Sequence, residues 1–270
     1  MTSDSLTSDD SLTSDSVTSD SRSIDRVALL LHGGGGPATV AGIADHLAAQ
    51  GMRVLAPTHP GWNGTERPER LADVPALAGF YLDQLATAGH RDVLLVGSSL
   101  GGWIAAEMAV RDDTGLIGAL VIIDGVGITV DRHPIRDFFA LDPRGVAEFS
   151  YHDPERFYVD PATLTDEQRT QRIGNVASLR AMAGDPYMHD PTLAARLAAI
   201  DVPTLVLWGE SDRIVTSGYG RALAERIPGA SFELILRAGH LPQLERPEAT
   251  FDSIDAFLAG ADFDRARVSH

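Results

Sequence analysis

The sequence contains neither cysteine nor lysine, and each absence excludes a kind of chemistry. Without cysteine the chain has no disulfide, no thiolate nucleophile and no Cys-ligated zinc site, which is consistent with a reducing compartment. All 22 basic residues are arginine, so Schiff-base chemistry, which needs a lysine amine, is excluded as well. The sequence contains no metal-ligand pattern and no cofactor-binding motif, so we expect neither a metal nor an organic cofactor.

Positive charge and long hydrophobic runs are also scarce. The formal net charge is −16 at pH 7, which disfavours a nucleic-acid partner, because such binding begins with the neutralisation of phosphates. No stretch reaches the roughly 18 apolar residues of a membrane helix, and the start, residues 1–6, lacks the basic and apolar segments of a secretory signal. We therefore expect a cytoplasmic protein without membrane contact whose partner is a small-molecule substrate.

The first 23 residues repeat the triplet Thr-Ser-Asp, which begins at Thr2, Thr7, Thr13 and Thr18. A segment with so little to bury does not offset the entropy lost on ordering, so residues 1–23 are predicted to be a disordered tail. An acidic arm that binds a basic partner is the functional alternative.

After the tail, short apolar runs alternate with helical patterns. The predicted strands are 27–31, 53–56, 92–96, 120–123, 204–208 and 232–236. The predicted helices are 38–50, 74–88, 102–110, 220–226 and 249–258. Continuous apolar strands that alternate with helices indicate a parallel sheet covered on both faces.

The alternation is interrupted over residues 126–200, which are richer in charge, proline and aromatics. A helix is predicted to open at Thr165, because Gln168 follows at the spacing of a capping box. We predict an α/β core of residues 24–125 and 201–262, into which 126–200 is inserted as a helical cap.

The strongest local motif is Gly-Ser-Ser-Leu-Gly at residues 97–101, a G-x-S-x-G pentapeptide between a predicted strand and a predicted helix. This is the context of a nucleophile elbow, a sharp turn that presents a serine hydroxyl above the sheet. The glycines are centred on Ser99, which makes Ser99 the candidate nucleophile and directs Ser98 elsewhere.

A serine hydroxyl needs a base, and the base needs an acid to orient it. His240 follows the predicted strand 232–236 in a glycine-containing loop, and Asp212 follows the strand 204–208. The chain order Ser, Asp, His suits this arrangement. Glu210 and Asp124 are rival acids, for which we expect loop solvation and turn capping.

The negative charge that develops during acyl transfer needs two fixed backbone N–H donors. The N–H of Leu100, directly after the candidate nucleophile, is expected to be one donor. The glycine run after the first predicted strand is expected to supply the other, with Gly34 as first choice and Gly35 as second. His32 is expected to organise this loop rather than to act as a base.

Five motifs in this order resemble the α/β-hydrolase superfamily over residues 26–260. They are Leu-Leu-His-Gly-Gly-Gly at 30–35, Pro-Gly-Trp-Asn-Gly-Thr at 60–65, the elbow at 96–102, Trp-Gly-Glu-Ser-Asp at 208–212 and Ala-Gly-His at 238–240. The resemblance implies an α/β-hydrolase fold with a serine-nucleophile mechanism. The four-glycine loop followed by Pro37 is similar to loops of carbon–carbon bond hydrolases of aromatic ring cleavage, whereas Ser-Leu-Gly-Gly at the elbow is more similar to esterases and lipases.

We therefore expect a serine hydrolase that cleaves a carboxylic ester, lactone or thioester of a small hydrophobic compound. Hydrolysis of a carbon–carbon bond in a ring-cleavage product is the alternative within the same mechanism. A ligand sensor without catalysis is a second alternative, against which the complete set of candidate residues argues. Four aromatic residues are expected to line the substrate pocket between core and cap: Trp62, Trp103, Phe138 and Phe139.

The chain departs from the family pattern at two places. The antiparallel hairpin that usually precedes the first strand has no counterpart here, so we expect about six strands and keep a homodimer open as the oligomeric state. The loop before Pro60 carries His59 where members usually have an acidic residue. His59 is expected to be a solvated loop histidine, with a place in the lining of the site as the alternative.

Overall fold

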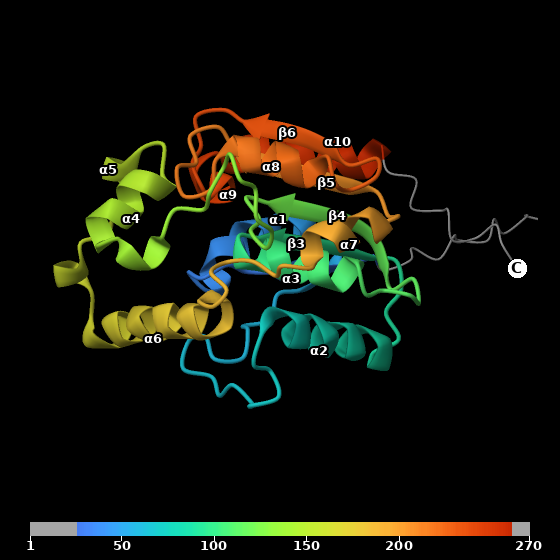
Figure 1. Cartoon of the computed structure of the whole chain (residues 1–270), viewed down its shortest axis with the longest axis horizontal. Coiled ribbons are helices and arrows are strands. Elements are labelled where there is room, and N and C mark those ends of the chain that lie inside the picture. Colours follow the sequence, from blue (N-terminus) through green and yellow to red (C-terminus); the bar gives the residue numbers. More distant parts are fainter. Residues whose placement is uncertain (1–25, 261–270) are drawn as a thin grey trace, which may run out of the picture.

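Six strands form one parallel sheet in the computed structural model, which describes residues 26–260 (Figure 1). Their order is β2-β1-β3-β4-β5-β6. The strands are β1 (Val27–Leu31), β2 (Arg53–Leu55), β3 (Val93–Ser98), β4 (Ile117–Ile123), β5 (Thr204–Gly209) and β6 (Ser231–Ile235). The predicted six-stranded parallel sheet is confirmed, and the tail predicted over residues 1–23 lies outside the described residues.

Helices cover both faces of the sheet, because successive strand side chains alternate between two hydrophobic cores. Val27, Leu29 and Leu31 of β1 point into the larger core, whereas Ala28 and Leu30 point into the smaller one. The larger core includes residues of α2 (Val74–Thr87), α3 (Leu100–Ala109) and α8 (Ser217–Ala224). The smaller core includes residues of α1 (Ala41–Ala49) and α10 (Pro247–Gly260).

The segment between β4 and β5 forms four α-helices, of which Figure 1 shows α4, α5 and α6 to one side of the sheet. They are α4 (Pro143–Ser150), α5 (Pro154–Phe157), α6 (Asp166–Ala183) and α7 (Leu193–Arg196). The Thr165 side chain caps α6 and Gln168 returns the bond, so the predicted capping box is present. The exact cap boundaries stay a prediction.

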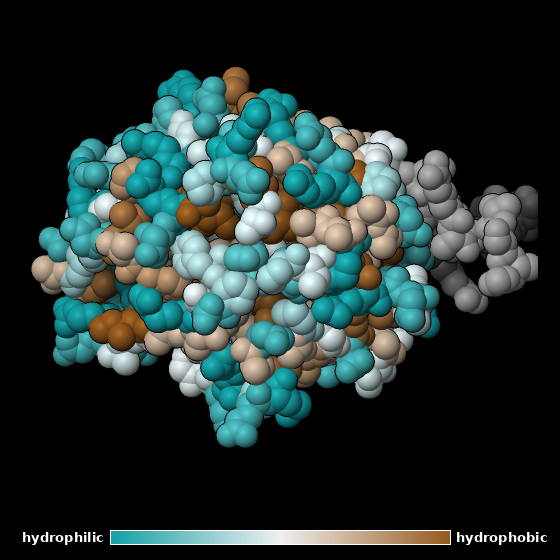
Figure 2. All heavy atoms as spheres, viewed as in Figure 1, coloured by the Kyte–Doolittle hydropathy of each residue, from teal (hydrophilic) through white to brown (hydrophobic). Residues whose placement is uncertain are grey.

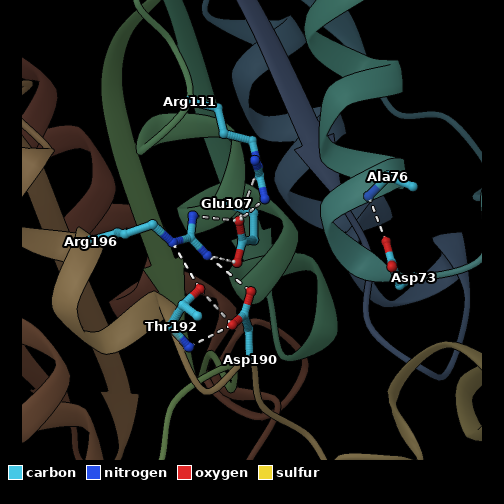
Figure 3. Close-up of polar contacts among 7 residues, drawn as sticks. All are labelled: Asp73, Ala76, Glu107, Arg111, Asp190, Thr192 and Arg196. Atoms are coloured by element: carbon cyan, nitrogen blue, oxygen red, sulfur yellow. Dashed lines mark hydrogen bonds and ion pairs between the residues drawn. The ribbon is translucent and has the colours of Figure 1, made fainter.

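An ion network around one buried glutamate ties α3 to the segment that follows α6 (Figure 3). Glu107 of α3 has no exposed side-chain surface, and its two oxygens accept bonds of 2.7 and 2.9 Å from Arg196 of α7. Arg111 also bonds to Glu107, and Asp190 accepts a further bond of 3.0 Å from Arg196. Because α3 begins directly after Ser99, this network fixes the helix that carries the elbow.

The surface on the face seen in Figure 2 mixes hydrophilic side chains with scattered hydrophobic ones. Within residues 26–260, no helix has both the length and the apolar character to cross a membrane.

Candidate active site

Ser99 lies at a strained turn between β3 and α3. Its backbone has φ 56° and ψ −117°, a conformation that non-glycine residues rarely adopt and that is common at functional sites. A Cβ atom on Gly97 would lie 2.1 Å from the carbonyl oxygen of Gly101, and one on Gly101 would lie 1.9 Å from that of Leu31. Both glycines of the pentapeptide are therefore required for the turn to close.

Ser99, His240 and Asp212 form a continuous chain of hydrogen bonds, although they are far apart in sequence. His240 Nε2 lies 2.9 Å from Ser99 Oγ, and His240 Nδ1 lies 2.7 Å from Asp212 Oδ2. With Nδ1 protonated, Nε2 is free to accept the Ser99 hydroxyl proton. This is the geometry of a serine nucleophile paired with a base and an orienting acid.

Asp212 is buried, with 3% of its surface exposed, and its carboxylate is well supplied with donors. Its Oδ1 accepts the backbone N–H groups of Ile214 and Val215 at 2.8 and 3.0 Å, while Oδ2 accepts the ring Nδ1–H of His240. Hydrogen bonds of this kind stabilise the ionised form of a carboxyl group. Asp212 can therefore hold His240 in one tautomer.

Ser98 and Glu210 do not face His240. The hydroxyl of Ser98 is buried and accepts a hydrogen bond of 3.1 Å from the Gln243 side chain. Glu210 is exposed and accepts the backbone N–H of Arg237 at 3.1 Å.

The expectation of a solvated Asp124 is wrong. Asp124 has no exposed surface, and the acceptor and donor atoms of Asp124, Asp212 and His240 lie within 4.8 Å of one another. Its Oδ1 accepts the N–H of Gly209 at 3.0 Å, and burial, followed by the charge of Asp212, raises the pKa of Asp124 well above its ordinary value. Asp124 is buried because the loops after β5 and β6 close over the end of β4, which the pattern of β4 alone does not reveal.

The same three residues resemble a set of metal ligands, but the atoms of His240 and Asp212 are already engaged in hydrogen bonds. Nδ1 of His240 carries the proton donated to Asp212, and Nε2 faces the Ser99 hydroxyl. Both oxygens of Asp212 accept N–H groups. A metal ligand needs a free lone pair, so this arrangement fits a proton relay better than an ion.

The glycine loop lies against Ser99 and beneath α6. A Cβ atom on Gly33 would lie 2.9 Å from the Cβ of Ser99, and one on Gly34 would lie 2.7 Å from the side chain of Leu179 in α6. Among the described residues, nothing accepts a hydrogen bond from the backbone N–H of Gly34, Gly35 or Leu100. These N–H groups therefore have no acceptor within the described part of the chain, and Leu179 packs against Gly34, while their contact with a ligand at Ser99 stays a prediction.

Two histidines beneath this loop are buried and neutral, which corrects the expectation for His59. His59 is fully buried and donates from Nε2 to the carbonyl oxygen of His32 at 2.9 Å, while its Nδ1 accepts the hydroxyl proton of Tyr81 at 2.6 Å. His32 accepts the N–H of His59 at 3.0 Å and donates to the carbonyl oxygen of Gly33 at 2.7 Å. Burial lowers the pKa of His32 to about 4. Burial, together with the nearby His32, holds that of His59 well below its usual value.

The prediction that Trp62 and Trp103 line the pocket is wrong for this conformation. Trp62 has no exposed surface, and its indole N–H donates to the carbonyl oxygen of Gly34 at 3.1 Å, so it supports the loop from behind. Trp103 is 3% exposed and packs against Gly127 in the core. Phe138 and Phe139 are half-buried in the cap segment, and their contact with substrate stays a prediction.

A cavity of about 260 Å³ lies at the start of the segment between β4 and β5. It is lined by residues 128–131 and 133–135 together with Tyr187, His189 and Tyr219, and it includes none of the three hydrogen-bonded residues. The position of the substrate pocket between core and cap therefore stays a prediction.

Sequence reasoning missed Glu245, which joins the histidine loop to the end of α4. Its buried carboxylate accepts the backbone N–H groups of Gly239, His152 and Asp153. The N–H of His240 also donates to the carbonyl oxygen of Ser150 at 2.6 Å. The one signal available was an acidic residue in the short helix α9 (Pro242–Glu245) directly after His240.

Comparison with known proteins assigns the family. The sequence model of the alpha/beta hydrolase family matches residues 28–253, so the chain belongs to this family. It is 29% identical over 248 residues to 2-hydroxy-6-oxononadienedioate/2-hydroxy-6-oxononatrienedioate hydrolase 2 of Pseudomonas putida, over 82% of this chain and 83% of the relative. It is 28% identical over 251 residues to a 2-hydroxymuconate semialdehyde hydrolase of Pseudomonas putida, over 87% and 88%. The chain is thus an enzyme of the hydrolase class.

Solved structures agree on the fold. The meta-cleavage product hydrolase CumD of Pseudomonas fluorescens IP01 superposes with a TM-score of 0.70 at 19% identity, over 87% of this chain and 90% of that one. An esterase of Exiguobacterium antarcticum superposes with a TM-score of 0.69 at 19% identity, over 87% and 92%. At such identities these structures establish the fold alone.

Proposed function

We propose that this enzyme hydrolyses a carbon–carbon bond in a 2-hydroxy-6-oxo-dienoic acid, the type of compound formed when an aromatic ring is cleaved. The observation that carries the chemistry is the chain of bonds from Ser99 through His240 to Asp212, at 2.9 and 2.7 Å on a strained elbow. The names of the relatives support the substrate class, and they favour this reaction over the ester hydrolysis expected from the elbow motif.

In this proposal Ser99 is the nucleophile, His240 the general base and Asp212 the acid that orients it. Ser99 Oγ attacks the C6 carbonyl carbon while its proton passes to His240 Nε2. The N–H groups of Leu100 and Gly34 stabilise the oxyanion, with Gly35 as the alternative donor, and Asp212 stabilises the imidazolium. Each donor of this kind typically contributes ~10²–10³ in rate.

The bond between C5 and C6 can break because the leaving carbanion at C5 is stabilised by conjugation with the 2-oxo group. Once the 2-hydroxy group has tautomerised to a 2-oxo group, the electron pair released from C5 moves through the C3–C4 double bond to the 2-oxo oxygen. That oxygen takes the proton held by His240, and the C6 fragment remains as an ester on Ser99. Water, deprotonated by His240, then releases the acid and restores the Ser99 hydroxyl.

Ester hydrolysis is the second candidate, because the same nucleophile, base and oxyanion donors serve it without the tautomerisation step. The elbow sequence Ser-Leu-Gly-Gly at residues 99–102 favours it. A small-molecule partner, a cytoplasmic location and a homodimer stay predictions in either case.

Turnover assays with two substrate types separate the candidates. Wild-type protein is incubated with 2-hydroxymuconate semialdehyde or 2-hydroxy-6-oxononadienedioate, and loss of the conjugated chromophore is followed. p-Nitrophenyl butyrate serves as the ester. We expect the dienoic acids to be cleaved with the higher kcat/KM, Ser99→Ala to be slower by roughly 10⁴-fold or more, and Ser98→Ala, the neighbouring serine, to remain active. Cleavage of the ester alone would replace the proposal with the second candidate, and equal rates for Ser99→Ala and wild type would refute both.

A further inference from the structure

Asp124 is a buried carboxyl group that has no role in the mechanism proposed above. It follows β4, has no exposed surface and uses one oxygen to accept the N–H of Gly209 at 3.0 Å. Its Oδ2 receives no hydrogen bond from any described residue. A buried carboxylate oxygen without a donor is energetically unfavourable, because burial removes its hydrogen bonds to water and no protein group replaces them.

Asp212 accepts more hydrogen bonds than its neighbour Asp124. Asp212 accepts three N–H groups, and Asp124 accepts one. One carboxyl oxygen of each side chain lies within 4.8 Å of the other, and each is the other's neighbouring charge. Two adjacent buried carboxyl groups do not both ionise readily, so they share one proton, and that proton resides on the group with fewer donors. Here that group is Asp124.

We infer that Asp124 is protonated at neutral pH and donates its O–H to Asp212, as a positioning residue for the acid of the proposed triad. When Oδ2 carries the proton, it becomes a hydrogen-bond donor and is no longer a buried acceptor without a donor. The other titratable groups that face Asp124 are His240 and, more weakly, Glu245. His240 then faces one negative charge at close range instead of two.

The catalytic consequence rests on the proposed function, but the proton can be detected without substrate. Infrared difference spectra of the full chain at pH 7 compare wild type with Asp124→Asn. Asparagine reproduces the protonated acid, because its carbonyl can accept from Gly209 and its amide can donate to Asp212. It also tolerates the positive φ of 45° at this position. We expect wild type to show the carbonyl stretch of a protonated carboxylic acid, and Asp124→Asn to lack it.

Glu210→Gln is the matched control, since Glu210 is an exposed carboxylate that follows the neighbouring strand β5. This variant is expected to keep the band. If wild type and Asp124→Asn have the same spectrum in the carboxylic-acid region, the inference is overturned, whatever the protein's activity.

The pH dependence of kcat/KM tests the positioning role with 2-hydroxymuconate semialdehyde as substrate. Asp124→Ala removes the donor, and we expect it to lower kcat about 10- to 100-fold, whereas Asp124→Asn is expected to restore most of the lost rate. The acid limb of the Asp124→Asn profile is expected to coincide with that of wild type. An ionised Asp124 would instead make this limb move to lower pH, because the substitution would then remove a charge from the site.

The two hypotheses fail in different ways. A missing infrared band in a protein that depends on Ser99 for turnover overturns the inference and leaves the proposed function standing. A band that disappears in Asp124→Asn, in a protein whose turnover is unaffected by Ser99→Ala, supports the proton on Asp124 and refutes the proposed function.

Discussion

Acidification is expected to destabilise this enzyme through the histidine pair beneath the glycine loop. His32 and His59 stack with ring centroids 3.8 Å apart, and both are buried. Each ring uses one nitrogen as donor and the other as acceptor. Protonating either ring would therefore break an accepted hydrogen bond and bury a charge without a partner.

The sign and size follow from the pKa of His32, which burial lowers from 6.5 to about 4. Between these two values the unfolded chain binds a proton at His32 that the folded chain does not, so stability falls as the pH falls. A window of about 2.5 pH units, at about 1.4 kcal/mol for each unit, gives a loss of about 3 kcal/mol from His32. His59, whose pKa is also lowered, adds a loss in the same direction.

Urea unfolding of wild type and His32→Asn, followed by circular dichroism between pH 7.5 and pH 4, isolates the contribution of His32 to the unfolding free energy. Asparagine can still donate to the Gly33 carbonyl but does not titrate. We expect His32→Asn to be less stable at pH 7 and its deficit relative to wild type to shrink by about 3 kcal/mol towards pH 4.

The control is His90→Asn, which removes a partly exposed histidine that follows α2. Its difference from wild type is expected to change little with pH. A deficit of His32→Asn that stays constant across the whole range would refute the reasoning, because it would mean that His32 titrates alike in the folded and unfolded chain.

Three further predictions concern single positions. Gly97→Ala is expected to abolish turnover in a steady-state assay, because its Cβ would lie 2.1 Å from a backbone oxygen, whereas Gly79→Ala, which has open space, keeps the wild-type rate. Glu107→Ala is expected to lose about 1.5–3 kcal/mol of unfolding free energy, since it removes the charged hydrogen bonds from Arg111 and Arg196, although Arg196 keeps its bond to Asp190. Glu148→Ala, from an exposed ion pair, loses under about 1 kcal/mol, and equal losses in urea unfolding would contradict this account. The stability of Asp124→Asn relative to wild type is expected to rise with pH above about pH 4, because the folded wild type keeps a proton at Asp124 that the unfolded chain loses, and a difference independent of pH in urea unfolding would contradict a protonated Asp124.

The strands could be predicted from the sequence because a parallel sheet buries both faces, which produces continuous apolar runs. The boundaries were less accurate where packing overrides local preference. β4 begins at Ile117, three residues before the predicted start, and includes Gly118, where a Cβ would lie 3.0 Å from the backbone of Asp92. A glycine argues against a strand by its propensity, yet here it permits a close approach between backbones.

The boundaries of helix α8 are also set by packing rather than by local preference. It covers 217–224 instead of the predicted 220–226 and contains Gly218 and Gly220. A Cβ at these positions would lie 2.1 Å from His133 and 2.3 Å from Trp208. Both glycines lower helix propensity, and the space they leave for side chains from other elements is not visible in the local pattern.

The elbow could be predicted because Ser99 and its two glycines lie within five consecutive residues of the chain. Asp212 and His240 could be proposed because the ends of parallel strands meet at one edge of the sheet. The burial of Asp124 and His59 was not predictable in this way. It depends on loops from other strands and on Tyr81, which closes over His59 from α2.

Covalent labelling tests the central claim most directly. Wild-type protein is treated with a fluorophosphonate, and the adduct is located by mass spectrometry, with His240→Gln treated in parallel. We expect one adduct, on Ser99, and much slower labelling when the imidazole is absent, because the hydroxyl then has no base. Labelling of wild type at another residue, or an equal rate at Ser99 in His240→Gln, would contradict a nucleophile activated by His240 and Asp212.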